Sequence, residues 1–197
     1  TDDLSNRQIG NLYGLALSLV RLGLVNDAEP IINRFLDEKH EFGHFHILYA
    51  DLMIGKNMPN EAIDHLKKRL QLSPRNIPLT IKYAELEMSY GDPKKAHEIL
   101  LDLFNNKIPT PYQIRLIANA ANNAGDKAEA FSYMAEFYLS IGNFQEAIEQ
   151  AQAGWRRVVI KATELGIAMP AIRKTAPITR TTFGAVFILD RKSTRLN

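Results

Sequence analysis

Two series of alanines recur along the chain at one fixed interval. One series is Ala28, Ala62, Ala96 and Ala130, and the other is Ala16, Ala50, Ala84 and Ala118. Each member of the second series precedes a member of the first by a constant offset of about one helix, which places one small residue on each of two successive helices. Small residues let two helix backbones approach closely. The pattern therefore predicts an all-α chain of repeated helix-turn-helix units.

The alanine interval identifies the type of repeat. A period of about 34 residues is that of the tetratricopeptide repeat, a pair of antiparallel helices. Apolar residues at helical spacing fill out each unit, as at Leu12, Leu15 and Leu19 in the first. Stacked units of this type form a right-handed solenoid with a concave wall that binds proteins. We expect about four and a half helix pairs over residues 8–150, preceded by a linker at residues 1–7.

Glycine turns separate the predicted helices. Gly91 supplies a helix stop, Asp92 a cap and Pro93 a first helical residue. Gly125 and Gly142 are separated by half of one repeat. The helix between them should therefore end one pair and begin the next, so that a ninth helix follows.

The charge of the chain changes sign near its end. Residues 1–150 carry 15 Lys and Arg against 20 Asp and Glu, whereas residues 151–197 carry 9 against 2. The alanine period is not continued after Gln150, and Pro170 and Pro177 interrupt any long helix. We expect residues 151–197 to form an irregular, poorly structured tail.

The origin of this tail is suggested by two similarities. Residues 190–197 resemble the in-frame translation of a widely used sequencing adapter, and residues 155–171 are similar to a stretch of 6-phosphogluconate dehydrogenases. We therefore expect the tail to be non-native, the alternative being a genuine basic extension that folds on a partner. A nucleic-acid role would rest on this tail alone, so we expect no nucleic-acid partner. No run of eighteen apolar residues is present, so we expect no membrane span.

The concave wall of the solenoid is the predicted protein-binding groove. By repeat spacing it should hold Tyr13, Leu17 and Val20, then Ile47, Asp51 and Ile54, then Ile81, Glu85 and Met88, and last Arg115, Asn119 and Asn122. Apolar positions can accept side chains of a peptide, and asparagines can bond its backbone. The alternative is that Tyr13, Leu17 and Ile47 only pack against neighbouring helices. Arg115 is the one cation expected on this wall, which argues against a basic cradle for a carboxylate terminus.

The stretch from His40 to His44 fits HExxH, the signature of zinc peptidases. Zinc binding needs both histidines on one face of one helix, with the glutamate as general base. The repeat frame instead places His40 and Glu41 in a loop and begins the next helix at Gly43. We expect no catalytic residue and no metal ligand in this chain, and a zinc peptidase that uses His40, Glu41 and His44 is the alternative.

Three passages resemble the C-terminal repeat region of the beta-barrel assembly-enhancing type of zinc metallopeptidase. They are residues 12–17 (LYGLAL), 77–85 (IPLTIKYAE), and 134–143 (MAEFYLSIGN) running into 147–150 (AIEQ). Proteins of that family are periplasmic and carry an N-terminal HExxH zinc peptidase domain before the repeats. The resemblance implies that this chain is the repeat domain alone, a non-enzymatic part of a metallopeptidase, with the zinc ion in the missing domain.

The same resemblance implies a role in outer-membrane protein assembly and quality control. The partner would be the outer-membrane β-barrel assembly machinery or the family's own protease domain, and the location would be the periplasm. The alternative is a tetratricopeptide adaptor of another compartment. The chain has no cysteine, which excludes disulfides and thiolate zinc sites and fits either compartment.

Overall fold

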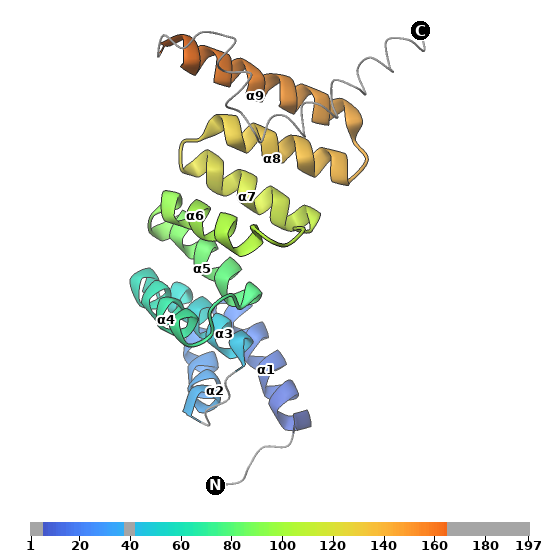
Figure 1. Cartoon of the computed structure of the whole chain (residues 1–197). Coiled ribbons are helices and arrows are strands. Elements are labelled where there is room, and N and C mark those ends of the chain that lie inside the picture. Colours follow the sequence, from blue (N-terminus) through green and yellow to red (C-terminus); the bar gives the residue numbers. More distant parts are fainter. Residues whose placement is uncertain (1–5, 38–41, 165–197) are drawn as a thin grey trace. The chain divides into compact units, whose positions relative to one another are not determined.

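The computed structural model describes residues 6–37 and 42–164 of the 197-residue chain (Figure 1). Every regular element in these ranges is an α-helix, and no strand occurs in them. The chain divides after Leu103 into two compact units, the first unit and the second unit.

Three helix pairs make up the first unit, and a pair followed by a longer helix makes up the second. The first unit contains α1 (Asn6–Arg21), α2 (Val25–Asp37), α3 (Gly43–Gly55), α4 (Pro59–Leu72), α5 (Ile77–Tyr90) and α6 (Pro93–Phe104), which ends at the boundary. The second unit contains α7 (Pro111–Asn123), α8 (Lys127–Ser140) and α9 (Phe144–Glu164). The expected all-α architecture of tetratricopeptide-type helix pairs is confirmed.

Side-chain caps and glycines set the helix ends. The Asn76 side chain accepts a hydrogen bond from the Leu79 amide at 3.2 Å and begins α5. Thr110 and Gln113 form a reciprocal capping box that begins α7. The predicted turn after Gly91 is present, because α5 ends at Tyr90 and α6 begins at Pro93.

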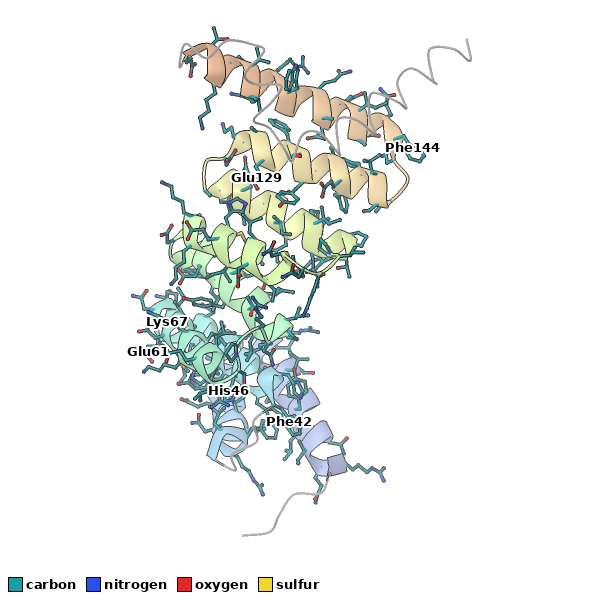
Figure 2. The ribbon with its side chains drawn as sticks, viewed as in Figure 1. Phe42, His46, Glu61, Lys67, Glu129 and Phe144 are labelled. Atoms are coloured by element: carbon teal, nitrogen blue, oxygen red, sulfur yellow. The ribbon has the colours of Figure 1, made fainter. Side chains whose placement is uncertain are left out.

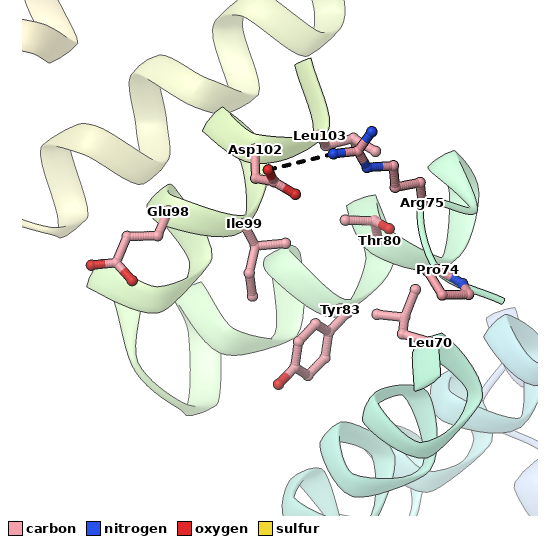
Figure 3. Close-up of a pocket in the computed structure, with 9 residues that line it drawn as sticks. All are labelled: Leu70, Pro74, Arg75, Thr80, Tyr83, Glu98, Ile99, Asp102 and Leu103. Carbon is pink, nitrogen blue, oxygen red and sulfur yellow. Dashed lines mark ion pairs between the residues drawn. The ribbon is translucent and has the colours of Figure 1, made fainter. Parts of the chain in front are cut away.

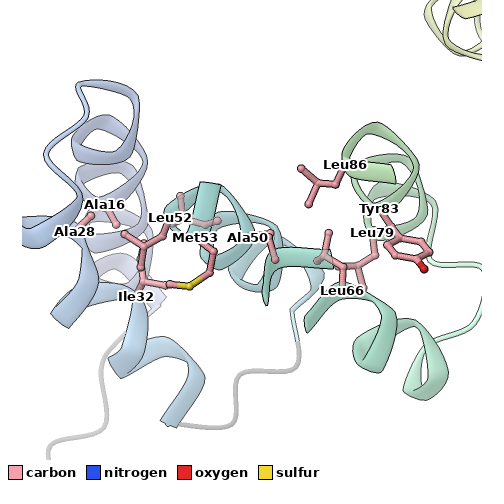
Figure 4. Close-up of a cluster of buried hydrophobic side chains, with 12 residues drawn as sticks. Ala16, Ala28, Ile32, Ala50, Leu52, Met53, Leu66, Leu79, Tyr83 and Leu86 are labelled. Atoms are coloured by element: carbon pink, nitrogen blue, oxygen red, sulfur yellow. The ribbon is translucent and has the colours of Figure 1, made fainter. Parts of the chain in front are cut away.

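The alanine series lies where the helices of the first unit meet. Ala16, Ala28, Ala50 and Ala62 are completely buried, together with Ile32, Leu52 and Leu66 of the same core cluster (Figure 4). An alanine at these positions leaves room for the neighbouring backbone, which a longer side chain would occupy. The period read from the sequence is therefore the period of the helix contacts.

The second unit differs from the sequence-based expectation at its end. The irregular tail is expected to begin after Gln150, but α9 continues to Glu164. Ala151 is buried against Ala135 of α8, and a Cβ added at Gly154 would lie 3.2 Å from Phe131. Small residues in α9 thus continue the packing on α8 without following the alanine period. Residues 165–197, the rest of the expected tail, lie outside the described residues.

Candidate protein-binding face

The first helices of the three pairs in the first unit contact one another, α1 with α3 and α3 with α5. They carry most of the predicted groove residues, all of them half-buried: Tyr13, Leu17 and Val20 on α1, Ile47, Asp51 and Ile54 on α3, and Ile81, Glu85 and Met88 on α5. These residues and Lys82 define the α1–α3–α5 face.

Several apolar residues of this face also contact the core. Tyr13, Leu17, Val20, Ile47 and Ile54 pack against the buried cluster of the first unit while they keep part of their surface exposed. Tyr13, Leu17 and Ile47 therefore do pack against neighbouring helices, as the alternative interpretation of these residues expects. It does not remove these residues from the surface, because each remains partly accessible.

The three remaining groove residues lie in the second unit. Arg115, Asn119 and Asn122 are exposed on α7. The guanidinium carbon of Arg115 is 5.8 Å from the ring centre of Phe137 on α8, a cation–π contact. These residues form a polar surface of their own unit.

An ion pair that the repeat spacing does not predict joins α3 to α5. The Lys82 ammonium is 2.5 Å from a carboxylate oxygen of Asp51, and both side chains are mostly buried, with 22% and 31% of their surface exposed. Lys82 is thus a second cation, besides Arg115, at a predicted wall residue. Lys82 was missed because the repeat frame places Ile81, its neighbour, on the wall.

The Asp51 carboxylate of this ion pair affects the pKa of Tyr13 on α1. Burial raises the pKa of the Tyr13 hydroxyl, the negative charge of Asp51 raises it further, and Arg21 opposes the shift. The hydroxyl is therefore protonated at physiological pH and can donate a hydrogen bond. Tyr13, Asp51 and Lys82 thus place polar groups from three helices among the apolar side chains of the face.

Aromatic rings gather where α3 begins. The His44 ring stacks on Phe42 with centroids 5.6 Å apart, and Tyr13 contacts both His44 and Phe45 edge to face. Phe45 in turn stacks at 4.5 Å on Phe35, which is fully buried. Phe42 remains 55% exposed (Figure 2). The sequence signal for this cluster is an aromatic residue just before a helix start, which the zinc motif obscures.

The HExxH stretch is only partly described. His40 and Glu41 lie outside the described residues, whereas Gly43 begins α3 as expected. His44 is therefore the second residue of that helix, with its ring on Phe42. Among the residues that the structure describes, no three potential ligands come together as a metal site.

None of the helices in the described ranges combines the length and the apolar character that crossing a bilayer requires.

Comparisons with known proteins add little to this picture. No protein-family model matches the chain, and no curated protein matches it. Among solved structures it is similar to a thermophilic TPR protein from Thermus thermophilus, with 23% identity and a TM-score of 0.43 over 77% of this chain and 75% of that one. A likeness of this strength carries no argument about function. The helix pairs themselves identify a tetratricopeptide-like domain, an architecture typical of protein-interaction modules.

Proposed function

We propose that the chain binds a protein partner and that the α1–α3–α5 face of the first unit is its working surface. The observation that supports this most directly is the composition of the face. The face carries half-buried apolar side chains together with the Asp51–Lys82 ion pair, and His44, which contacts Tyr13, stacks on the exposed ring of Phe42. Aromatic anchors next to a few fixed polar groups are typical of the residues that dominate binding energy in interfaces.

The rigidity of the face favours binding. Its side chains are held by helices that already contact one another, so little conformational entropy is lost when a partner docks. The Tyr13 hydroxyl and the Asp51 carboxylate can bond backbone groups of an extended segment, while Leu17 and Ile47 contact its apolar side chains.

Site-specific photocrosslinking tests this surface. Crosslinkers placed at Tyr13, Ile47 and Asp51 should all capture the same discrete partner, whereas one at Lys67 on the exposed side of α4 should not (Figure 2). The variant Tyr13→Ala should weaken capture at the other positions without loss of helicity. Crosslinks at Lys67 alone, or none from the face, would reject it.

We also propose a more specific identity, the repeat domain of a periplasmic zinc metallopeptidase that acts in outer-membrane protein assembly and quality control. It is supported by the three passages that resemble that family, within residues 12–17, 77–85 and 134–150. In this proposal the partner is the β-barrel assembly machinery or the protease domain, and the zinc ion belongs to that domain. This chain is then not itself an enzyme.

Two measurements test this identity. The gene that encodes the chain should contain an HExxH peptidase domain upstream of the repeats, and a gene without one would favour the tetratricopeptide adaptor of another compartment. The purified chain should bind no stoichiometric zinc. One-to-one binding that is lost in His44→Ala would instead support the peptidase alternative that uses His40, Glu41 and His44.

A further inference from the structure

A pocket of about 400 Å³ opens on the third helix pair (Figure 3), and none of its lining residues belongs to the α1–α3–α5 face. Four sequence segments line it: Leu70 at the end of α4, Pro74 and Arg75 in the following turn, Thr80 and Tyr83 on α5, and Glu98, Ile99, Asp102 and Leu103 on α6. On α5 the face uses Ile81, Lys82, Glu85 and Met88 instead, so the two surfaces can be tested separately.

The polar groups of two lining residues, Tyr83 and Thr80, form hydrogen bonds within the protein. The Tyr83 hydroxyl accepts a hydrogen bond from the Lys95 ammonium at 2.5 Å, and Lys95 is paired with Glu87 at 2.5 Å. The Thr80 hydroxyl donates to the Asn76 carbonyl at 2.9 Å. Both polar groups are therefore satisfied within the protein, which leaves the Tyr83 ring and the Thr80 methyl group as floor.

The walls are apolar and the rim is charged. Leu70, Ile99 and Leu103 contribute aliphatic side chains. At the rim, Arg75 lies 3.8 Å from Asp102, and these side chains are 66% and 70% exposed, so the pair is weak and open to competition. Glu98 is a second exposed carboxylate of the pocket. Two carboxylates against one guanidinium give the rim a net negative charge.

We propose that this pocket receives an apolar side chain of a partner protein segment that also carries a neighbouring lysine or arginine. The volume is within the range of sites that hold small groups, and the exposed rim allows entry of a side chain that remains attached to a chain. The apolar anchor displaces water from Leu70 and Ile99. The adjacent cation pairs with Glu98 and with Asp102, in competition with Arg75.

Short synthetic peptides test the proposal on the full chain. The probe has one central phenylalanine next to two lysines. One comparison peptide has glutamates in place of the lysines, and another has alanine in place of the phenylalanine. Binding is followed by NMR of the labelled methyl groups of Leu70, Ile99 and Leu103. We expect saturable shifts of these methyl groups with the lysine peptide, and about fivefold weaker binding of the glutamate peptide.

A matched pair of charge variants locates the effect. Glu98→Lys should abolish the preference for the lysine peptide, whereas Asp64→Lys, at the equivalent position of the preceding repeat, should leave it unchanged. Ile99→Phe should weaken every peptide, because the larger ring fills the pocket. If the methyl groups do not shift, if the glutamate peptide binds as well as the lysine peptide, or if the alanine peptide binds as well, the proposal is wrong.

Discussion

The second and third helix pairs have the same backbone plan but carry different residues and contacts at equivalent positions. His46, Tyr49 and His65 of α3 and α4 stand one full repeat before Thr80, Tyr83 and Ile99 of α5 and α6. In the second pair, His46 Nδ1 and His65 Nε2 are 3.0 Å apart, and the Tyr49 ring lies 4.4 Å from that of His65. In the third pair, the equivalent residues border the open pocket.

The difference originates in the partner of the tyrosine. Tyr83 is bonded by Lys95, which Glu87 holds in place. The equivalents of Lys95 and Glu87 in the second pair are Glu61 and Met53, neither of which supplies an ammonium group. Tyr49 instead packs on His65. A partly buried salt bridge thus replaces ring packing, and the pocket lies at this position in the third pair.

The buried alanine that the two pairs share should be the position most sensitive to substitution. Ala84 is fully buried in the third pair, as Ala50 is in the second. Leucine at either position should destabilise the fold by up to about 3 kcal/mol, because the close approach of the helices leaves no volume for it. The free energy of unfolding from urea titration measures this. Lys94→Leu on the exposed surface of α6 is the control and should change stability little. Equal effects at all three positions would contradict the repeat register.

Low pH should destabilise the second helix pair more than the third. Burial, together with the positive charge of Arg69, lowers the pKa of both His46 and His65 to about 4. An unfolded histidine has a pKa near 6.5, so the unfolded chain binds protons first as the pH falls. Stability is therefore complete above about pH 6.5 and is lost progressively as the pH falls from there towards 4.

The double variant His46→Thr/His65→Ile, which imports the residues of the third pair, is the test of this origin. Its unfolding free energy should depend less on pH between about 7 and 5 than that of the parent chain. An unchanged pH slope would assign the acid sensitivity to other groups. The His46 Nε2 atom is buried without a hydrogen-bond partner in the described structure. Burial of this polar atom costs stability even when both histidines are neutral.

Much of the fold could be predicted from the sequence because helix contacts repeat with the chain. The alanine period located the buried positions Ala16 to Ala130, and the glycine turns located the helix ends. The end of α9 could not be found in this way. Its contacts with α8 use Ala151 and Gly154, which follow helical spacing without the alanine period.

The candidate sites were less accessible to sequence reasoning. Repeat spacing brought Tyr13 and Asp51 to one face, but it did not reveal that Lys82 pairs with Asp51. A long side chain reaches across a helix face, so its position in the repeat does not fix where its charge lies. The pocket beside Tyr83 was missed for a similar reason, since it depends on the contact of Lys95 with two residues of another helix.

Removal of the Lys95–Glu87 salt bridge should make the third helix pair resemble the second. Burial alone would raise the pKa of Glu87, but hydrogen bonds from Lys95 and from the Asp92 amide outweigh it and hold the pKa below its usual value. Glu87→Met, which imports Met53 of the second pair, leaves both donors without this acceptor. We expect a loss of about 1.5 kcal/mol, since Lys95 is 40% exposed and can be solvated.

The peptide titration gives the second readout for this variant. A Tyr83 ring released from Lys95 should turn into the pocket, and the lysine peptide should then bind more weakly. Glu85→Met on the opposite side of α5 is the control and should not affect peptide binding at this pocket. Unchanged stability and unchanged binding in Glu87→Met would show that the salt bridge does not keep the pocket open.

The smallest expected effect concerns the rim, and it is stabilising. Arg75 has a backbone φ of 62°, in the left-handed region that glycine adopts without strain. Arg75→Gly should raise the unfolding free energy by about 0.5 to 1 kcal/mol, because relief of strain outweighs the loss of an exposed ion pair with Asp102. Asn57, with a φ of 61°, is the matched comparison, and Asn57→Gly should gain less stability because asparagine tolerates this conformation.

The same Arg75→Gly change removes the competitor for Asp102, so the lysine peptide should bind more tightly. A variant that is less stable than the parent, or that binds the peptide more weakly, would mean that the Arg75–Asp102 pair is a structural contact of the third helix pair.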